Sequence, residues 1–290
     1  MLRFVLRRLV LLVPVLFGLT ALVFAIARLL PGDPVALAAG PNATPAEIAA
    51  YGREFGLDRP LLVQYGDYVA GLLRGDFGVS IYTRRPVRED LQAYLPATLE
   101  LVFAAMLLAI LVGIPAGLAA AVWRDRWPDY LSRVVALGSI SMPRFFLGLL
   151  LQLLFAMWLG WLPLGGRYPI IEDPPALVTG FLTIDALISR DLTAFGVALQ
   201  HLAMPAVAMS LSPLATIMRM MRASTLEVMQ QDYVLTERAL GLPQRLIVLK
   251  YVARNAISST LTVIGLYFGW LLGGTVLVET VFDWPGLGLY

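Results

Sequence analysis

Few residues in this chain could carry out chemistry, and their number argues against a catalytic centre. His201 is the only histidine and cysteine is absent, so a histidine–cysteine metal site and a thiol nucleophile are both excluded. Serines and aspartates are present, but without a second histidine-type base we find no hydrolase arrangement. We interpret His201 as a packing or interfacial residue rather than as a metal ligand.

The charged residues also form neither an ATP-binding motif nor the intramembrane ionisable groups of an ion-driven carrier. Lys250 is the only lysine and stands outside any Gly-x-x-x-x-Gly-Lys-Ser/Thr phosphate loop, so ATP cannot be bound by that route. No acidic residue lies deep in an apolar segment. Glu100 and Glu279 fall near the outer ends of two such segments, where we expect solvent or an external subdomain to reach them. Carriers driven by protons or ions need ionisable groups within the membrane, so self-powered transport is disfavoured.

Residues 222–256 carry the clearest pattern outside the apolar segments. The spacing predicts a helix over 225–241, ended by Gly241, because glycine accepts the left-handed conformation that closes many helices. Pro243 is suited to begin a second helix. One face of the first helix is formed by Leu226, Met229, Tyr233, Thr236 and Leu240, and one face of the second by Leu246, Leu249 and Val252 or Ala253.

An amphipathic helix pair of this kind needs a surface for its apolar faces. That surface could be the lipid headgroup layer, the ends of the chain's own apolar segments, or a groove on a soluble partner. Periodicity alone does not decide between them.

Arg144 follows Pro143 inside an apolar segment. A guanidinium in this setting is costly. It either faces a water-accessible cavity or a partner subunit, or it reaches the interface from a helix displaced by the proline. Arg219 and Arg222, at the inner end of the next apolar segment, are interpreted as ordinary interfacial anchors.

Glycines recur at every fourth residue in two apolar segments: Gly113 and Gly117 in one, and Gly265, Gly269 and Gly273 in the other. Such spacing lets helix backbones approach closely. The glycines therefore predict tight packing, either within the bundle or against a second membrane subunit.

The elements that position these residues follow from composition. The chain is 59% hydrophobic and 14% charged, whereas soluble domains average about 25% charged residues. Helices must therefore cross a bilayer, which takes about 20 apolar residues each. We predict an all-α polytopic membrane bundle with five spans near 9–30, 97–122, 134–160, 199–221 and 257–279. The first is interpreted as a retained span rather than a signal peptide.

Arginine placement predicts the orientation of these spans. The basic N-terminus and the segments 123–133 and 222–256 are expected in the cytoplasm. Residues 31–96 are expected to form a small external helical subdomain between an N-terminal part, 1–30, and a core, 97–290.

Two short helices are expected in the external subdomain. Thr44, Pro45 and Glu47 form the pattern of a capped helix start. A second helix is predicted near 60–74.

The stretch from Asp232 to Leu242, continued by Arg254-Asn255-Ala256, resembles the cytoplasmic loop of ABC importer permeases, in particular the dipeptide/oligopeptide/nickel branch. The resemblance covers essentially the whole chain. Its other motifs are Leu6-Arg7-Arg8-Leu9, Pro31-Gly32-Asp33-Pro34, Gly75-Asp76-Phe77-Gly78 with Ser80, Pro96-Ala97-Thr98-Leu99-Glu100, Ser141-Met142-Pro143, Glu279-Thr280 and Trp284-Pro285-Gly286-Leu287-Gly288.

The resemblance implies a multi-pass subunit of a bacterial or archaeal cytoplasmic membrane that forms half of a path for peptides or similar small solutes. Its partners would be a second permease, two cytoplasmic subunits that bind the ATP, an external solute-binding protein and membrane lipid, with no nucleic acid and no cofactor in this chain. The implied ATPase-coupling residues are Asp232, Tyr233, Thr236, Glu237, Ala239, Gly241, Leu242, Arg254 and Asn255. The implied path residues are Ser141, Met142, Pro143 and Arg144.

The sequence departs from the family pattern in two residues and in length. Glu237 replaces a small alanine of the family and Ser259 replaces a proline, so docking could be tuned or weakened. The family has a sixth span, so we expect this chain to be a partial permease. A membrane enzyme or scaffold whose loop lies on lipid, and a self-gated channel, remain the competing interpretations. The solute is not specified by the sequence.

Overall fold

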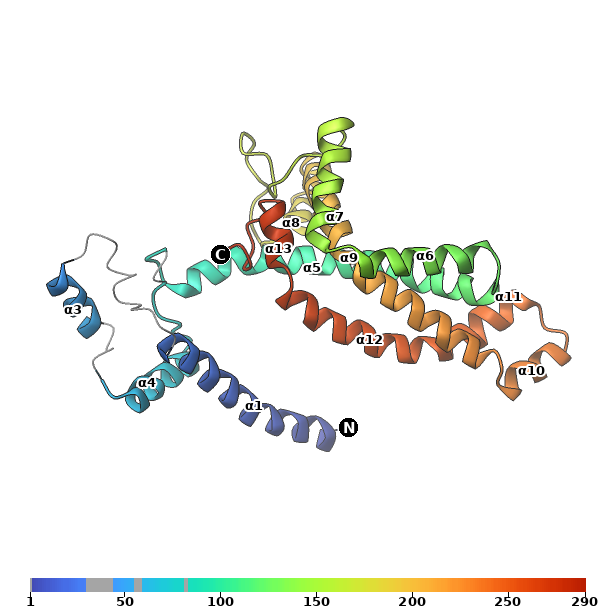
Figure 1. Cartoon of the computed structure of the whole chain (residues 1–290), viewed down its shortest axis with the longest axis horizontal. Coiled ribbons are helices and arrows are strands. Elements are labelled where there is room, and N and C mark those ends of the chain that lie inside the picture. The colour runs from blue at the N-terminus through green and yellow to red at the C-terminus, as the bar shows by residue number, and fades with distance from the viewer. Residues whose placement is uncertain (1, 30–43, 55–58, 81–82) are drawn as a thin grey trace. The chain divides into compact units, whose positions relative to one another are not determined.

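The computed structural model describes residues 2–29, 44–54, 59–80 and 83–290, and helices dominate them (Figure 1). Apart from one isolated antiparallel bridge between Val79 and Pro86, these residues contain no β-structure. The expected all-α fold is confirmed. The chain divides into two compact units, Met1–Leu91 and Gln92–Tyr290.

The first unit contains α1 (Leu2–Leu29), α3 (Pro45–Glu54) and α4 (Leu61–Arg74). Helices α1 and α4 pack through aromatic and hydroxyl groups. The ring of Tyr65 lies edge-on to Phe17, with 5.6 Å between ring centroids, and its hydroxyl lies 3.0 Å from Thr20 Oγ1. The predicted helix near 60–74 is thus confirmed.

Helix α3 begins at Pro45, as the capping pattern predicts. The side chain of Glu47, which a capping box also requires, lies outside the described residues.

Three long helices form the second unit's centre: α5 (Val87–Val122), α9 (Leu192–Val228) and α12 (Ala253–Gly273). Helix α12 packs along α9 (Figure 1), and α5 approaches α9 closely at Gly113 and Gly117. Their shared core is aliphatic, and its buried members include Leu101, Val102, Met209, Ile217 and Leu271.

The apolar pattern over 134–160 predicted one continuous helix, but the structure divides this third apolar segment. It divides into α6 (Trp127–Ser141), α7 (Arg144–Leu151) and the π-helical η1 (Gln152–Trp158). The two halves are bent by 105°. Pro143 explains the break, because a proline disfavours helical backbone at the preceding residue, and Met142 is accordingly extended.

The last predicted span, 257–279, begins and ends earlier than expected. Helix α12 ends at Gly273, and α13 (Val276–Val281) is a separate short helix. The pair Gly273-Gly274 explains the end, because glycine is a poor residue for helix interiors.

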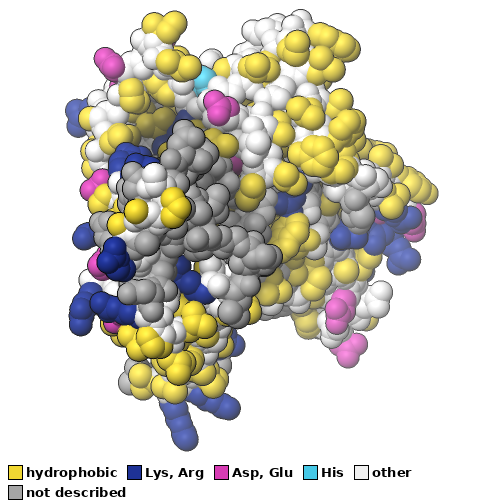
Figure 2. Space-filling view, turned by 60° about the vertical axis from the view of Figure 1, so that its left-hand side comes forward, with side chains coloured by type: hydrophobic (Ala, Val, Ile, Leu, Met, Phe, Trp, Pro, Cys, Tyr) yellow, Lys and Arg dark blue, Asp and Glu magenta, His cyan; other side chains and the backbone are white. Residues whose placement is uncertain are grey.

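Within the described part of the chain, four helices are long and apolar enough to cross a membrane, or five if the bent pair counts as one span. They are Val5–Arg28, Val87–Val122, Leu192–Val228 and Gln244–Gly273. Hydrophobic side chains gather in several patches on the face shown in Figure 2, as lipid-facing surface requires.

Short helices lie at both ends of α9. Helix α8 (Leu182–Ile188) precedes it. At its other end lie α10 (Asp232–Ala239), α11 (Gln244–Leu246) and the π-helical η2 (Ile247–Val252). Helices α8 and α10 therefore lie toward opposite ends of α9 (Figure 1).

Candidate coupling site and translocation cavity

The segment 222–256 contains a helix break that the sequence pattern did not predict. Helix α9 ends at Val228, and α10 begins at Asp232 after an extended Gln231. The prediction of a single helix over 225–241 is therefore wrong. An acid in the first turn favours a new helix start, and the turn lets α10 rotate so that Val234 faces the rest of the fold.

Val234 anchors α10. It is completely buried and clusters with Ile247 and Val252 of η2. Beside this cluster, Asn255 Nδ2 donates a 2.7 Å hydrogen bond to the Tyr233 hydroxyl. Two predicted coupling residues from different helices are thus joined directly.

The corner after α10 has the expected form. Gly241 has φ of 77°, the left-handed conformation that ends a helix, and Pro243 precedes the first residue of α11. The predicted apolar face of the next helix is confirmed only for Val252. Leu246 and Leu249 are exposed, while Ile247, Val248 and Val252 are buried. The wider π-helical turn of η2 changes which side chains share a face.

The outer face of α10 is open. Among the predicted coupling residues, those exposed are Asp232, Tyr233, Thr236, Ala239, Gly241, Arg254 and Asn255, and those partly buried are Glu237 and Leu242. Leu235 and Leu240 are exposed too, Leu240 by 72%. The sequence pattern did not assign Leu235 to this face, because the predicted periodicity ran without interruption through the turn at Gln231.

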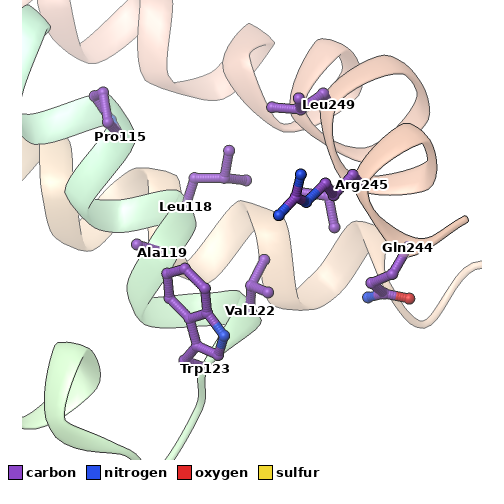
Figure 3. Close-up of a pocket in the computed structure, with 9 residues that line it drawn as sticks. Pro115, Leu118, Ala119, Val122, Trp123, Gln244, Arg245 and Leu249 are labelled. Atoms are coloured by element: carbon purple, nitrogen blue, oxygen red, sulfur yellow. The ribbon is translucent and has the colours of Figure 1, made fainter.

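A groove of about 460 Å³ lies between the end of α5 and the α11–η2 segment. Figure 3 shows Arg245 and Leu249 on one side and Leu118 and Val122 of α5 on the other. Trp123, half exposed, closes one end. The groove is mainly apolar and adjoins the segment that follows α10.

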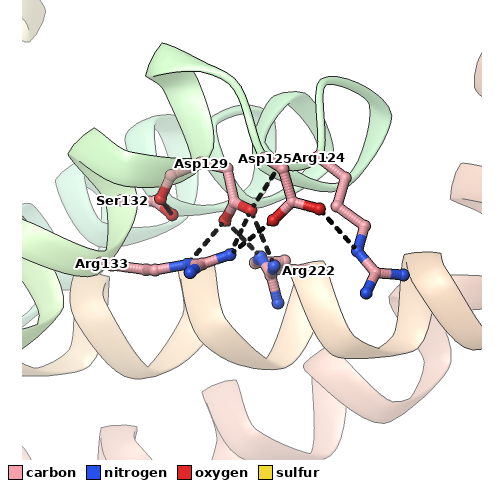
Figure 4. Close-up of polar contacts among 6 residues, drawn as sticks. All are labelled: Arg124, Asp125, Asp129, Ser132, Arg133 and Arg222. Carbon is pink, nitrogen blue, oxygen red and sulfur yellow. Dashed lines mark hydrogen bonds and ion pairs between the residues drawn. The ribbon is translucent and has the colours of Figure 1, made fainter.

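The sequence-based predictions did not include a buried carboxylate that lies near the α10 end of the spans. Asp129, in the first turn of α6, is completely buried and accepts hydrogen bonds from Arg222 Nε at 2.7 Å and Nη2 at 2.9 Å (Figure 4). Arg133 Nη2 adds a third at 2.7 Å. Arg222 is therefore a structural partner of α6 rather than a simple interfacial anchor. The Asp129–Arg133 spacing of four residues was the available signal.

The bend between α6 and α7 opens onto a cavity of about 370 Å³. Met142, Pro143 and Arg144 line it, whereas Ser141 does not and instead donates to the Leu137 carbonyl. The Arg144 guanidinium carbon lies 4.0 Å from the centroid of the Trp270 ring on α12. Three of the four predicted path residues thus share one cavity.

Comparison with known proteins decides what kind of molecule carries these features. Residues 113–290 match the family described as the binding-protein-dependent transport system inner membrane component, and residues 1–102 match its N-terminal region. The chain belongs to this family. It is therefore a permease subunit of an ABC importer, a multi-pass inner-membrane protein that works in a complex with other subunits, and a transport component rather than an enzyme.

Several relatives resemble it along nearly its whole length. A probable D,D-dipeptide transport system permease of Escherichia coli strain K12 is 48% identical over 279 residues, which cover 96% of this chain and 82% of the relative. A dipeptide permease of Alkalihalophilus pseudofirmus is 43% identical, covering 100% and 87%. A glutathione permease of Escherichia coli strain K12 is 40% identical, covering 99% and 85%.

At the opposite end of the permease, two acids are buried against residues of the core, whereas contact with solvent or with the external subdomain was expected. Glu100 is 3% exposed and Glu279 is 0% exposed. Glu100 accepts from Arg167 Nε at 3.1 Å and from the amide and hydroxyl of Thr183 at 2.8 and 2.7 Å. These partners lie far away in sequence, so no local pattern could reveal the burial.

Glu279 brings together two sequence motifs of the permease. It accepts 2.7 Å and 3.0 Å hydrogen bonds from the Thr98 hydroxyl and the Leu289 amide. Trp284 Nε1 donates to the Ala97 carbonyl at 2.9 Å. The segment after α13 is therefore fastened to the start of the apolar part of α5.

Asp185 and His201 organise the loops at this end. Burial raises the pKa of Asp185, but hydrogen bonds from the Thr179 hydroxyl and from the Thr179 and Gly180 amides outweigh it and hold this pKa below its ordinary value. His201 Nδ1 lies 3.1 Å from the Gly165 and Gly166 carbonyls. No group of potential metal ligands occurs among the described residues.

The glycine sets differ in their surroundings. A Cβ added to Gly117 would lie 2.4 Å from the Met218 carbonyl oxygen, and one added to Gly113 would lie 3.1 Å from Ile217 Cγ2. These glycines pack against α9. A Cβ at the α12 glycines, Gly265, Gly269 or Gly273, would meet no described atom within 4 Å.

Proposed function

We propose that this permease forms half of the membrane path of an importer for short peptides or similar small solutes. ATPase subunits drive it by binding α10 and moving it. The observation that carries the proposal is the open outer face of α10, held in place by Val234 beneath it. Exposed apolar residues on a firmly seated short helix are typical of a helix that fits a partner's groove. The peptide substrate rests on the named relatives.

In this arrangement the N-terminus and α10 lie in the cytoplasm. The external subdomain comprises 31–96 and the core comprises 97–290. The other components are a second permease, two ATP-binding subunits and an external solute-binding protein. Arginines near the α10 end of the spans, including Arg124, Arg126 and Arg133, support this orientation.

Movement of α10 would reach the membrane part through two connections. The first is the Val234 contact with η2, which continues into α12. The second is the turn into α9, whose Arg222 is paired to Asp129 of α6. A shift of α10 would thus act on three helices, and ATP would favour one of two arrangements by binding them unequally.

Leu240→Glu tests the proposal. The side chain is exposed, so a charge there should leave the permease folded while disrupting an apolar docking contact. We expect recovery of the ATPase with the tagged permease to fall about tenfold, the loss that about 1.4 kcal/mol of contact energy produces. The matched control is Leu192→Glu, because Leu192 is 74% exposed at the other end of α9.

Both variants should be compared with the unmodified permease by co-purification and by uptake into vesicles. Leu192→Glu should recover ATPase normally. If Leu240→Glu and Gly241→Asp both retain the ATPase and normal uptake, then α10 is not the docking element and the proposal fails.

A further inference from the structure

Arg144, in the membrane part, has no acidic partner among the described residues. It lies at the first position of α7 and is partly buried. Its Nη2 atom is buried and has no hydrogen-bond partner among them. By contrast, Arg167 and Arg222 each pair with a buried carboxylate, Glu100 and Asp129.

Stacking on Trp270 compensates Arg144 only in part. The face of an indole ring attracts a cation, and the 4.0 Å separation between guanidinium carbon and ring centroid is close. A ring accepts no in-plane hydrogen bonds, however. The planar fork of N–H groups that suits a carboxylate remains available.

The cavity beside Arg144 has the size and lining of a small-ligand site. Its volume of about 370 Å³ lies within the range of about 300–1,000 Å³ typical of such sites. Ser139 and Ser212 add hydroxyl groups, while Phe145 and Leu277 add apolar surface. One cation within a mostly apolar wall suits a small molecule that has one anionic end.

We propose that this cavity is a subsite for the carboxylate of the transported solute, with Arg144 as the residue that pairs with it during passage. The inference rests on the proposed function and adds a chemical class to it. The Trp270 ring holds the guanidinium in place, and the carboxylate supplies the acceptors that the described residues lack. Pairing of Arg144 with an acidic residue of a neighbouring subunit would leave the cavity with no preference for anions.

Because the chain contains no cysteine, one introduced thiol can report on the cavity. Ser212→Cys places it in the lining. The assembled importer is treated with an anionic or a cationic methanethiosulfonate reagent, and the mass of this chain is followed over time. We expect the anionic-to-cationic rate ratio to fall about tenfold when Arg144→Gln is added, since nearby unit charges interact strongly in a partly dehydrated site.

Two controls complete the design. At Ser259→Cys, an exposed position elsewhere, Arg144→Gln should leave the rate ratio unchanged. Arg144→Lys, which retains the charge, should keep most of the anion preference at Ser212→Cys.

A protection assay needs no change at Arg144. In the Ser212→Cys importer, L-alanyl-L-alanine should slow labelling, while its C-terminal amide should not. Equal protection by the acid and the amide, or an unchanged rate ratio in Arg144→Gln, overturns the proposal. Labelling is read without transport, so this failure is distinct from failure of the ATPase-docking experiment.

Discussion

Asp129 shows how one side chain can join distant parts of a membrane bundle. It lies 93 residues from Arg222 in sequence, and the two form a double hydrogen bond beneath the protein surface. A carboxylate removed from water is costly unless its charge is matched. Here the guanidinium groups of Arg222 and Arg133 match it.

We therefore predict that Asp129→Asn destabilises the permease by roughly 3 kcal/mol, because Arg222 loses its counter-charge and Arg133 keeps only the exposed Asp125. Differential scanning fluorimetry in detergent would measure this as a lowered Tm. The control is Asp67→Asn, since Asp67 forms an exposed pair with Arg59, and such pairs contribute about 1 kcal/mol or less. Equal Tm values for the two variants would contradict the prediction.

At the residue scale, the sequence predicted what depends on local conformation or composition. Gly241 was predicted to close a helix because few other residues accept its backbone geometry. The pairing of Asp129 with Arg222 could not be predicted, because it depends on how α6 lies against α9. The burial of Glu100 and Glu279 depends likewise on distant partners.

At the scale of elements, glycines with the same four-residue spacing differ in how closely a neighbouring helix packs against them. Gly117→Ala should destabilise the permease by about 1–3 kcal/mol, because its methyl group would overlap the α9 backbone. Gly265→Ala should be neutral or stabilise by about 0.5–1 kcal/mol, since alanine favours a helix interior. Thermal unfolding of the isolated permease would compare them, and a larger loss for Gly265→Ala would refute the assignment.

Helix breaks were the least predictable elements. The apolar pattern over 134–160 and the three-to-four spacing over 225–241 each favoured one helix, yet Pro143 and the turn at Gln231 divide them. Periodicity records which side chains are apolar, whereas the break depends on what each half packs against. Val234 makes this clear, because its burial against η2 requires α10 to leave the axis of α9.

At the scale of the molecule, the α12 glycines leave a narrow open face on a helix otherwise joined to α9. Under the proposed function, a second permease approaches there. Gly269→Leu should then preserve the fold of the chain but lower recovery of the second permease several-fold, because close backbone packing depends on small residues. Co-purification with differently tagged permeases would show this.

The matched control is Leu266→Ala, a change at an exposed residue of the same helix. Full recovery of the second permease with Gly269→Leu would place the contact elsewhere.

The fastening of the segment after α13 has an evolutionary consequence. A methyl group at Gly286 would lie 2.5 Å from the Glu279 carboxylate and from the Thr98 hydroxyl, and one at Gly288 would lie 2.7 Å from the backbone of Val276. The Glu279 and Thr98 side chains cannot move away without losing the hydrogen bond between them, and the Val276 backbone is held in α13. Selection should therefore retain glycine at both positions for as long as Glu279 and Thr98 persist, and lineages that lose one member of this set should lose the others with it.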